Sequence, residues 1–187
     1  MRVRRSSLLI AVLLAQAASA TAAEVSLDLA TGLHLTKTEW RGDLAFSGLF
    51  KGGLRVNPWL MPYLQLRVGY GSVDQRMLTL LSLGAQVRPF GRIGGVEPYA
   101  RLAWSHQHEE SLSVVSDDPF GALFGIGDGI RHRGGFDGGL GFDFPIDRFE
   151  GGRFYTAVEL STVWFYDDRG PHWYVSGGAL LGVDYEL

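Results

Sequence analysis

The residues best suited to chemistry are gathered in one segment of the chain. His106 and His108 are separated by one residue, so they share a face if the strand before them continues. Glu109 and Glu110 follow directly. More acids and a third histidine come later: Asp117, Asp118, Asp128 and His132. Imidazole and carboxylate groups at such spacing can hold a divalent metal ion. A solvated surface explains the same composition more simply, so we assign no metal and no cofactor.

The same segment contains the only local candidate for nucleophilic catalysis. Ser105 stands beside His106, with Glu109 nearby. Neighbouring residues on a strand point to opposite faces, which argues against a direct Ser–His pair. The glycine-rich run 125–129 precedes no helical pattern, so it gives little support to a nucleotide-binding loop. The sequence therefore predicts no catalytic residue.

Composition limits the class of protein. The 187 residues are 46% hydrophobic, 12% aromatic and 20% charged, with 26 Gly and no Cys. These values suggest one domain that is neither disordered nor built on disulfides. The glycine and aromatic content is typical of many short alternating strands rather than of long helices.

The first residues form an export signal. Three arginines within the first five residues precede an apolar run over 8–15, which is too short to span a bilayer. Ala18-Ser19-Ala20 then provides a cleavage signature of small residues, with Ala20-Thr21-Ala22 as an alternative. We predict a signal peptide over 1–22 and one domain over 23–187. Losing three arginines leaves the mature chain acidic, which disfavours nucleic acid as a partner.

From residue 24 onward the hydrophobic pattern has a period of two, typical of strands with one apolar and one polar or small face. Eight such runs are recognisable: 24–36, 44–56, 63–71, 78–88, 98–106, 136–144, 154–166 and 173–187. Leu49 is the one misfit in the second run. All seven prolines fall between runs, and most connections are short enough for hairpins. The pattern predicts an all-β, eight-stranded antiparallel up-and-down sheet.

One long insertion, 107–131, interrupts this series. Besides the histidines and acids above, it contains an apolar stretch that includes Phe120 and Phe124. Such a patch can dip into lipid, meet a partner or pack over the sheet. We therefore expect the surface interactions of the protein here, through His106, His108, Glu109, Glu110, Phe120 and Phe124.

Alternation alone does not say which face is inside. A soluble lipocalin-like barrel would enclose the apolar face, whereas a membrane barrel would turn it toward lipid. Charges on the polar face are segregated by strand. The second to fifth runs carry Lys51, Arg55, Arg67, Arg88 and Arg101, and the first and the last three carry Asp28, Asp137, Asp143, Glu159, Asp184 and Glu186. Closing the sheet would bring these rows together as an interior charge network, which favours the membrane barrel.

Tryptophan placement favours the same interpretation. All five tryptophans lie at or just beyond the ends of the predicted strands, where amphipathic rings meet a membrane interface. The apolar face would then lie in lipid and the charges inside. An eight-stranded barrel has room only for its own side chains, so we expect a salt-bridged plug rather than a wide pore.

The end of the chain carries a family resemblance. Gly182, Tyr185 and Leu187 lie in the last strand, in a pattern that resembles the C-terminal assembly signal of bacterial outer-membrane barrels. Leu180 departs from the polar residue that this pattern prefers, and Leu187 replaces the usual terminal aromatic. With the export signal and eight runs, the chain resembles the small eight-stranded outer-membrane β-barrels.

The resemblance implies a Gram-negative outer-membrane location and contact with lipid, lipopolysaccharide and the barrel assembly machinery. It also implies that 37–43, 72–77, 107–131 and 167–172 face the outside, with a possible partner at 107–131, and that the role is structural or one of surface interaction. Some such barrels modify lipid A. Their His-x-Ser-Asn arrangement is absent here, since His172 is followed by Trp173 and Tyr174. A lipid A enzyme and a soluble barrel with an apolar ligand remain the alternatives.

Overall fold

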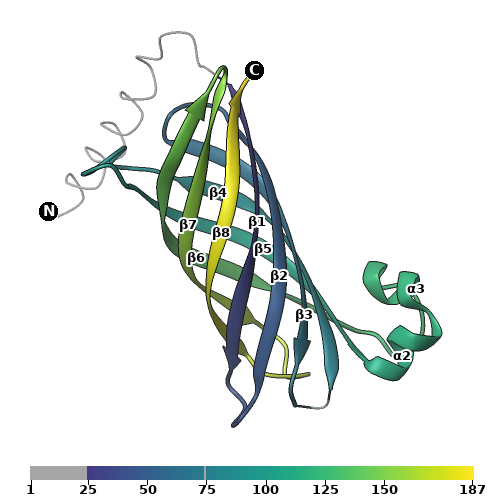
Figure 1. The fold of residues 1–187 in the computed structure, drawn as a ribbon. Helices are drawn as coiled ribbons and strands as arrows, with labels where there is room; N and C mark the ends of the chain where they lie inside the picture. Colours follow the sequence, from purple (N-terminus) through teal and green to yellow (C-terminus); the bar gives the residue numbers. More distant parts are fainter. Residues whose placement is uncertain (1–24, 74) are drawn as a thin grey trace, which may run out of the picture.

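A computed structural model describes residues 25–73 and 75–187. The predicted signal peptide over 1–22 and its cleavage site lie outside the described residues. The strands are β1 (Ser26–Thr38), β2 (Leu44–Arg55), β3 (Leu60–Gly71), β4 (Arg76–Val87), β5 (Glu97–Ser111), β6 (Arg131–Phe149), β7 (Gly152–Phe165) and β8 (Trp173–Glu186). They form one closed barrel in sequence order, in which every neighbouring pair is antiparallel (Figure 1). The predicted fold class is confirmed.

The two strands farthest apart in the chain close the barrel. β1 pairs with β8 from Ser26 opposite Glu186 to Thr38 opposite Tyr174. Closure leaves none of these eight strands with a free edge, so the backbone donors and acceptors are satisfied by neighbouring strands.

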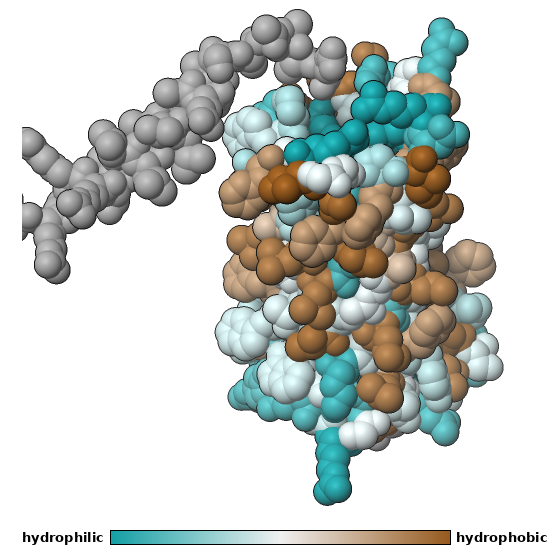
Figure 2. Space-filling view, turned by 60° about the vertical axis from the view of Figure 1, so that its left-hand side comes forward, coloured by the Kyte–Doolittle hydropathy of each residue, from teal (hydrophilic) through white to brown (hydrophobic). Residues whose placement is uncertain are grey.

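The barrel turns its apolar face outward. Leu33, Leu83 and Leu140 are 57%, 63% and 65% exposed, whereas Asp28 and Ser105 are fully buried. On the face that Figure 2 shows, hydrophobic residues lie across the middle of the barrel and hydrophilic residues lie toward both ends. An interior of polar side chains rules out the lipocalin-like alternative, which needs the opposite orientation. Leu49, the misfit, points inward and packs with Ala30 and Leu180 in a small interior cluster.

The connections divide the barrel into two ends. We call the end that carries the C-terminus and the three short connections 56–59, 88–96 and 150–151 the terminal end (Figure 1). The opposite end carries the β5–β6 connection, which contains α2 (Leu112–Asp117) and α3 (Pro119–Phe124) and projects sideways from the barrel. We call residues 112–130 the excursion, and this end the excursion end.

Neither helix of the excursion is long. No helix in the described part of the chain has the length and apolar character needed to cross a membrane.

The β5–β6 connection is shorter than the predicted loop 107–131. In the structure β5 continues to Ser111 and β6 begins at Arg131, so the connection spans only 112–130. His106, His108, Glu109 and Glu110 therefore lie on a strand and not in a loop. The ladder continues here, but outward-facing residues become polar, and the hydrophobic alternation that reveals a strand disappears.

The placement of one tryptophan was also wrong. Trp104 lies in the middle of β5, not at its end. It still belongs to an aromatic row, because it is in register with Phe136, which pairs with Trp164, which pairs with Trp173. All four side chains are at least 39% exposed. We call this row the aromatic girdle; β5 and β6 extend beyond it toward the excursion.

Gly182, in the predicted assembly signal, allows a close approach between β7 and β8. A Cβ atom at this position would lie 2.2 Å from the ring of Tyr155. That ring is fully buried, and its hydroxyl donates a hydrogen bond to Asp28 Oδ1 at 2.7 Å. Gly182 therefore leaves the space that the Tyr155 ring occupies, and the hydrogen bond from this ring joins β7 to β1.

We predict that Gly182→Ala destabilises the folded barrel by about 1–3 kcal/mol, since Tyr155 must move from its site. Urea unfolding in lipid vesicles measures the loss. Gly177→Ala on the same strand is the matched control, because a Cβ there meets nothing within 4 Å. Equal effects of the two substitutions would contradict this account.

Candidate functional site

Charged side chains fill the middle of the barrel interior around Arg101. This guanidinium binds Glu159 through two contacts, Nη2 to Oε1 at 2.8 Å and Nε to Oε2 at 2.9 Å. Its Nη1 lies 2.8 Å from Asp137 Oδ2 and also donates to the hydroxyl of Tyr63. The side chains of Arg101, Asp137 and Glu159 are fully buried. Four strands supply this middle layer: β5, β6 and β7 provide its charges and β3 provides Tyr63.

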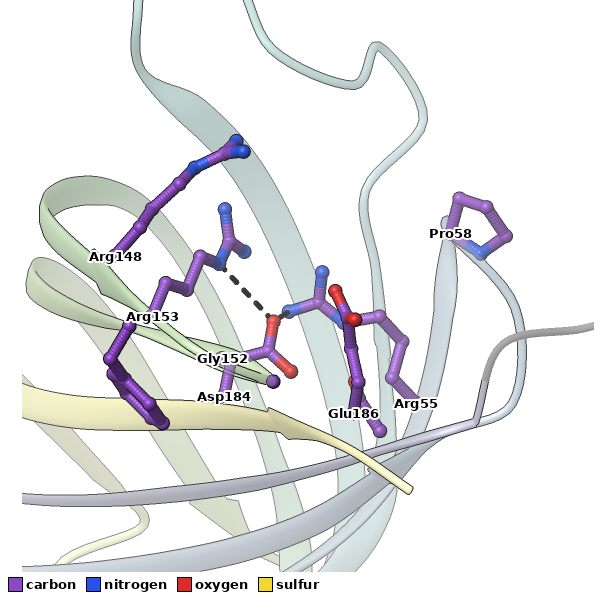
Figure 3. A pocket seen from close by; sticks show the side chains of 10 residues that line it. Arg55, Pro58, Arg148, Gly152, Arg153, Asp184 and Glu186 are labelled. Atoms are coloured by element: carbon purple, nitrogen blue, oxygen red, sulfur yellow. Dashed lines mark hydrogen bonds and ion pairs between the residues drawn. The ribbon is translucent and has the colours of Figure 1, made fainter.

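A second group of ion pairs lies at the terminal end. Arg55 Nη2 is 2.8 Å from Asp184 Oδ2, and Arg88 Nη2 is 2.7 Å from Asp143 Oδ2. Arg153 reaches Asp184 at 3.2 Å. In Figure 3, Arg55 and Arg153 approach the same carboxylate at the rim of a pocket of about 320 Å³. Arg153 also pairs with Glu97.

A third group lies at the excursion end. Arg133 is fully buried and binds Glu109 at 3.1 Å and Asp167 at 3.0 Å. Tyr174 donates a hydrogen bond to the same Glu109 at 2.8 Å. Nearby, Arg76 Nη2 lies 2.6 Å from Asp43 Oδ2. Both ends and the middle of the interior are therefore occupied by paired charges.

Apolar side chains fill the space between the middle layer and the excursion end. Leu78 and Leu80 from β4 pack with Val163 and Phe165 from β7, against Ala45 and Tyr174. The cavity beside them measures only about 20 Å³, enough for about one water molecule. Ser47, Arg67 and Gln107 also line this cavity, so the layer blocks passage by close packing of apolar and polar side chains.

The structure places the sequence-predicted interior residues inside the barrel and brings most of them into ion pairs. These are Asp28, Arg55, Arg88, Arg101, Asp143, Glu159 and Asp184. Lys51 instead donates to Gln86 Oε1 at 3.0 Å and lies over the Tyr99 ring. Arg67 donates to the hydroxyls of Ser176 and Ser161 across the lumen, and no carboxylate of the described residues lies within salt-bridge distance. Glu186 lines the pocket in Figure 3.

Sequence reasoning missed the charged residues that complete the network: Asp43, Arg76, Glu97, Glu109, Arg133 and Arg153. A signal for Glu109 was present. It has the same odd-number parity as Arg101, Ala103 and Ser105, so an extended β5 places it inside. The misplaced end of β5 hid this signal.

The outward side of β5 and β6 carries a histidine cluster. His106 and His108 point outward from β5, and His132 lies opposite His108 on β6. His106 Nε2 and His132 Nδ1 are 3.2 Å apart. Each of the three rings offers one nitrogen, and these nitrogens lie within 4.8 Å of one another. The structure thus brings the histidines together on their own, and the carboxylates Glu109 and Glu110 are not part of this set.

The remaining predicted surface and assembly residues lie apart from this cluster. Phe120 and Phe124 are 75% and 66% exposed on α3, whereas Glu110 is buried on β5. Tyr185 faces outward and packs near Phe149, and the Leu187 amide donates to the Val25 carbonyl.

The Ser105–His106 candidate is not assembled. Ser105 is fully buried inside the barrel, where its hydroxyl lies 2.8 Å from that of Ser82. His106 projects from the outer face.

Two loops meet at the excursion end through a charged contact. His172 Nε2 lies 3.0 Å from Asp168, and its Nδ1 lies 3.1 Å from Glu39. Hydrogen bonds to Asp168 and then to Glu39 raise the pKa of His172 above its ordinary value of 6.5. The contact therefore ties the β7–β8 loop to the β1–β2 loop when the imidazole is protonated.

We predict that Arg101→Ala lowers the free energy of unfolding by about 3–5 kcal/mol, because it leaves Asp137 and Glu159 buried without their partner. Urea unfolding in vesicles measures the change. Arg92→Ala is the control: its side chain is 39% exposed and pairs with Glu97 at 3.2 Å, so its loss should cost less than about 1 kcal/mol. A small effect of Arg101→Ala would contradict a tightly coupled interior.

We also predict that NMR titration finds the pKa of His172 above 6.5, and that Glu39→Gln brings it back toward that value. Because the folded-state pKa is raised, the contact contributes stability below the ordinary histidine pKa and loses it as the pH rises through the raised value. A pKa unchanged by Glu39→Gln would show that this contact does not form in solution.

Comparison with known proteins finds relatives in structure only. No protein-family model and no curated protein matches the sequence. Among solved structures, Neisserial surface protein A aligns with a TM-score of 0.56 and 14% identity, over 87% of this chain and 97% of its own. The N-terminal β-barrel domain of OprF from Pseudomonas aeruginosa aligns at 0.53 and 15% identity, over 89% and 100%.

The attachment invasion locus protein Ail of Yersinia pestis aligns at 0.50 and 14% identity, over 89% of this chain and all of that chain. These identities establish the fold and not the role. With eight strands in sequence order, an apolar outer face and a charged interior, the chain has the fold of the small eight-stranded outer-membrane β-barrels.

Proposed function

We propose that the protein is a closed, non-enzymatic barrel of the outer membrane that anchors the excursion at the cell surface. The filled interior is the observation that carries this proposal. A barrel with a packed interior offers rigidity and a fixed frame for its loops, and such loops are where proteins of this architecture vary.

The interior supports closure at every level. Ion pairs occupy both ends and the middle, and an apolar layer lies between two of these groups. A diffusing solute would have to break paired charges that have no bulk water to replace their partners. The 320 Å³ pocket at the terminal end is therefore a mouth that ends on the Arg55–Asp184 pair.

The excursion supports the role in surface interaction. Phe120, Phe124 and Ile126 are each at least 66% exposed, on a segment that projects beside the barrel (Figure 1). Exposed aromatic and aliphatic groups clustered on a short segment are typical of contact surfaces. The position beyond the aromatic girdle would place this surface at the outer boundary of the membrane.

We predict that the protein is recovered from an outer-membrane fraction only in detergent, with a folded band that shifts on boiling. Reconstituted in planar bilayers, it should show no unitary conductance above that of lipid alone. The gel shift of protein recovered from the same vesicles is the control for folded insertion. Regular conductance steps would overturn the closed barrel, and a water-soluble monomer would overturn the membrane location.

A further inference from the structure

The histidine cluster has the geometry of a ligand set. His108 and His132 are direct cross-strand partners, and their ring centroids are 4.9 Å apart. His106 shares the outward face of β5, with its ring centroid 4.9 Å from that of His108 and 5.4 Å from that of His132. The three rings therefore surround one point on the outside of the β5–β6 hairpin.

The cluster lies just beyond the apolar belt. Trp104 and Phe136, which pair in the aromatic girdle, precede the cluster on β5 and follow it on β6. His106 and His108 are partly exposed and His132 is exposed, so the cluster is open to solution. Three imidazoles on a lipid-facing belt would be costly, but at its margin they are accessible and hydrated.

The excursion holds one of the three rings in place. Gly125 follows α3 with a φ of +69°, and a Cβ there would lie 2.2 Å from His108 Cε1. Only glycine fits both the left-handed backbone and the contact. In this position, His108 Nδ1 is buried without a hydrogen-bond partner among the described residues. A polar atom left in this way has an unfilled bonding capacity.

We propose that His106, His108 and His132 bind one divalent transition-metal ion, with Zn²⁺ as the ion best suited to the geometry. Tetrahedral Zn–N bonds of about 2.0–2.1 Å need ligand nitrogens about 3.4 Å apart. His106 Nε2 and His132 Nδ1 already lie at 3.2 Å, and one nitrogen of His108 lies within 4.8 Å of a nitrogen of each of the other two rings.

The donor set determines which ions fit. Three neutral imidazoles suit Zn²⁺, Cu²⁺ and Ni²⁺, whereas Ca²⁺ and Mg²⁺ require oxygen ligands. A three-histidine site also leaves one coordination position for water or an exogenous ligand. Glu110 lies on the same face of β5, about 7 Å along the strand from His108, and its buried carboxylate has no hydrogen-bond partner among the described residues.

Metal binding would connect three elements. The ion would join β5 to β6 through the histidines, and it would fix His108 against the glycine that ends α3. The position of the excursion would then depend on metal occupancy.

The proposal is tested by isothermal titration calorimetry, in which Zn²⁺ alone is added to the untagged, folded protein in detergent. We expect one equivalent per chain. Cu²⁺ in place of Zn²⁺ should give an electron paramagnetic resonance spectrum with coupling to several nitrogens. His106→Ala and His132→Ala should each weaken binding by at least about tenfold.

His172→Ala is the matched control. It removes a histidine outside the cluster, which lies 3.0 Å from Asp168, and it should leave Zn²⁺ binding unchanged. Heat-modifiable gel migration checks that each variant is folded, and His132→Gln, at an exposed position, serves if His106→Ala does not fold. The proposal is overturned if the wild type binds no stoichiometric metal, if the cluster variants bind like the wild type, or if His172→Ala abolishes binding.

Discussion

The whole structure depends on one constraint: a charge inside this barrel has no bulk water around it and must find a charged or polar partner inside the barrel. Arg101 meets the constraint with two carboxylates and a tyrosine hydroxyl, all contributed by other strands. The outer face meets the opposite requirement, since leucine and aromatic side chains there need an apolar surrounding. The alternation of each strand satisfies both requirements at once, and a register shift of one residue would violate both.

The fold could be predicted from the sequence because nearly every strand shows this alternation of apolar and polar residues. Eight runs, their antiparallel order and the single long connection all followed from periodicity and connection lengths. The expectation that every proline lies between strands was wrong for Pro62, Pro98 and Pro145, which lie within β3, β5 and β6. The ends of β5 and β6 did not follow from these patterns. Beyond Trp104 the outward residues are His106 and His108, so hydrophobicity no longer distinguishes the two faces although the backbone ladder continues.

The candidate site was predictable only in part, for a related reason. The sequence shows which strands carry basic and which carry acidic residues, but partners across a barrel depend on its closure and on side-chain reach. Arg67 illustrates this limit, since it meets the hydroxyls of Ser161 and Ser176 instead of an acid. The histidine cluster needed the register as well, because His132 lies opposite His108 only once the strand pairing is known.

The seam between β1 and β8 has a consequence for how the chain reaches this state. It joins residues at opposite ends of the described chain, such as Ser26 and Glu186. The entropic cost of bringing these two strands together is therefore the largest of any strand pair. Interior contacts cross the seam, among them Arg55 with Asp184, Tyr155 with Asp28 and Thr36 with Ser176. None of them can form in an open sheet. We therefore expect the last hairpin to dock and the terminal charges to be neutralised in a single slow, cooperative step, because contacts of such long range limit folding rates.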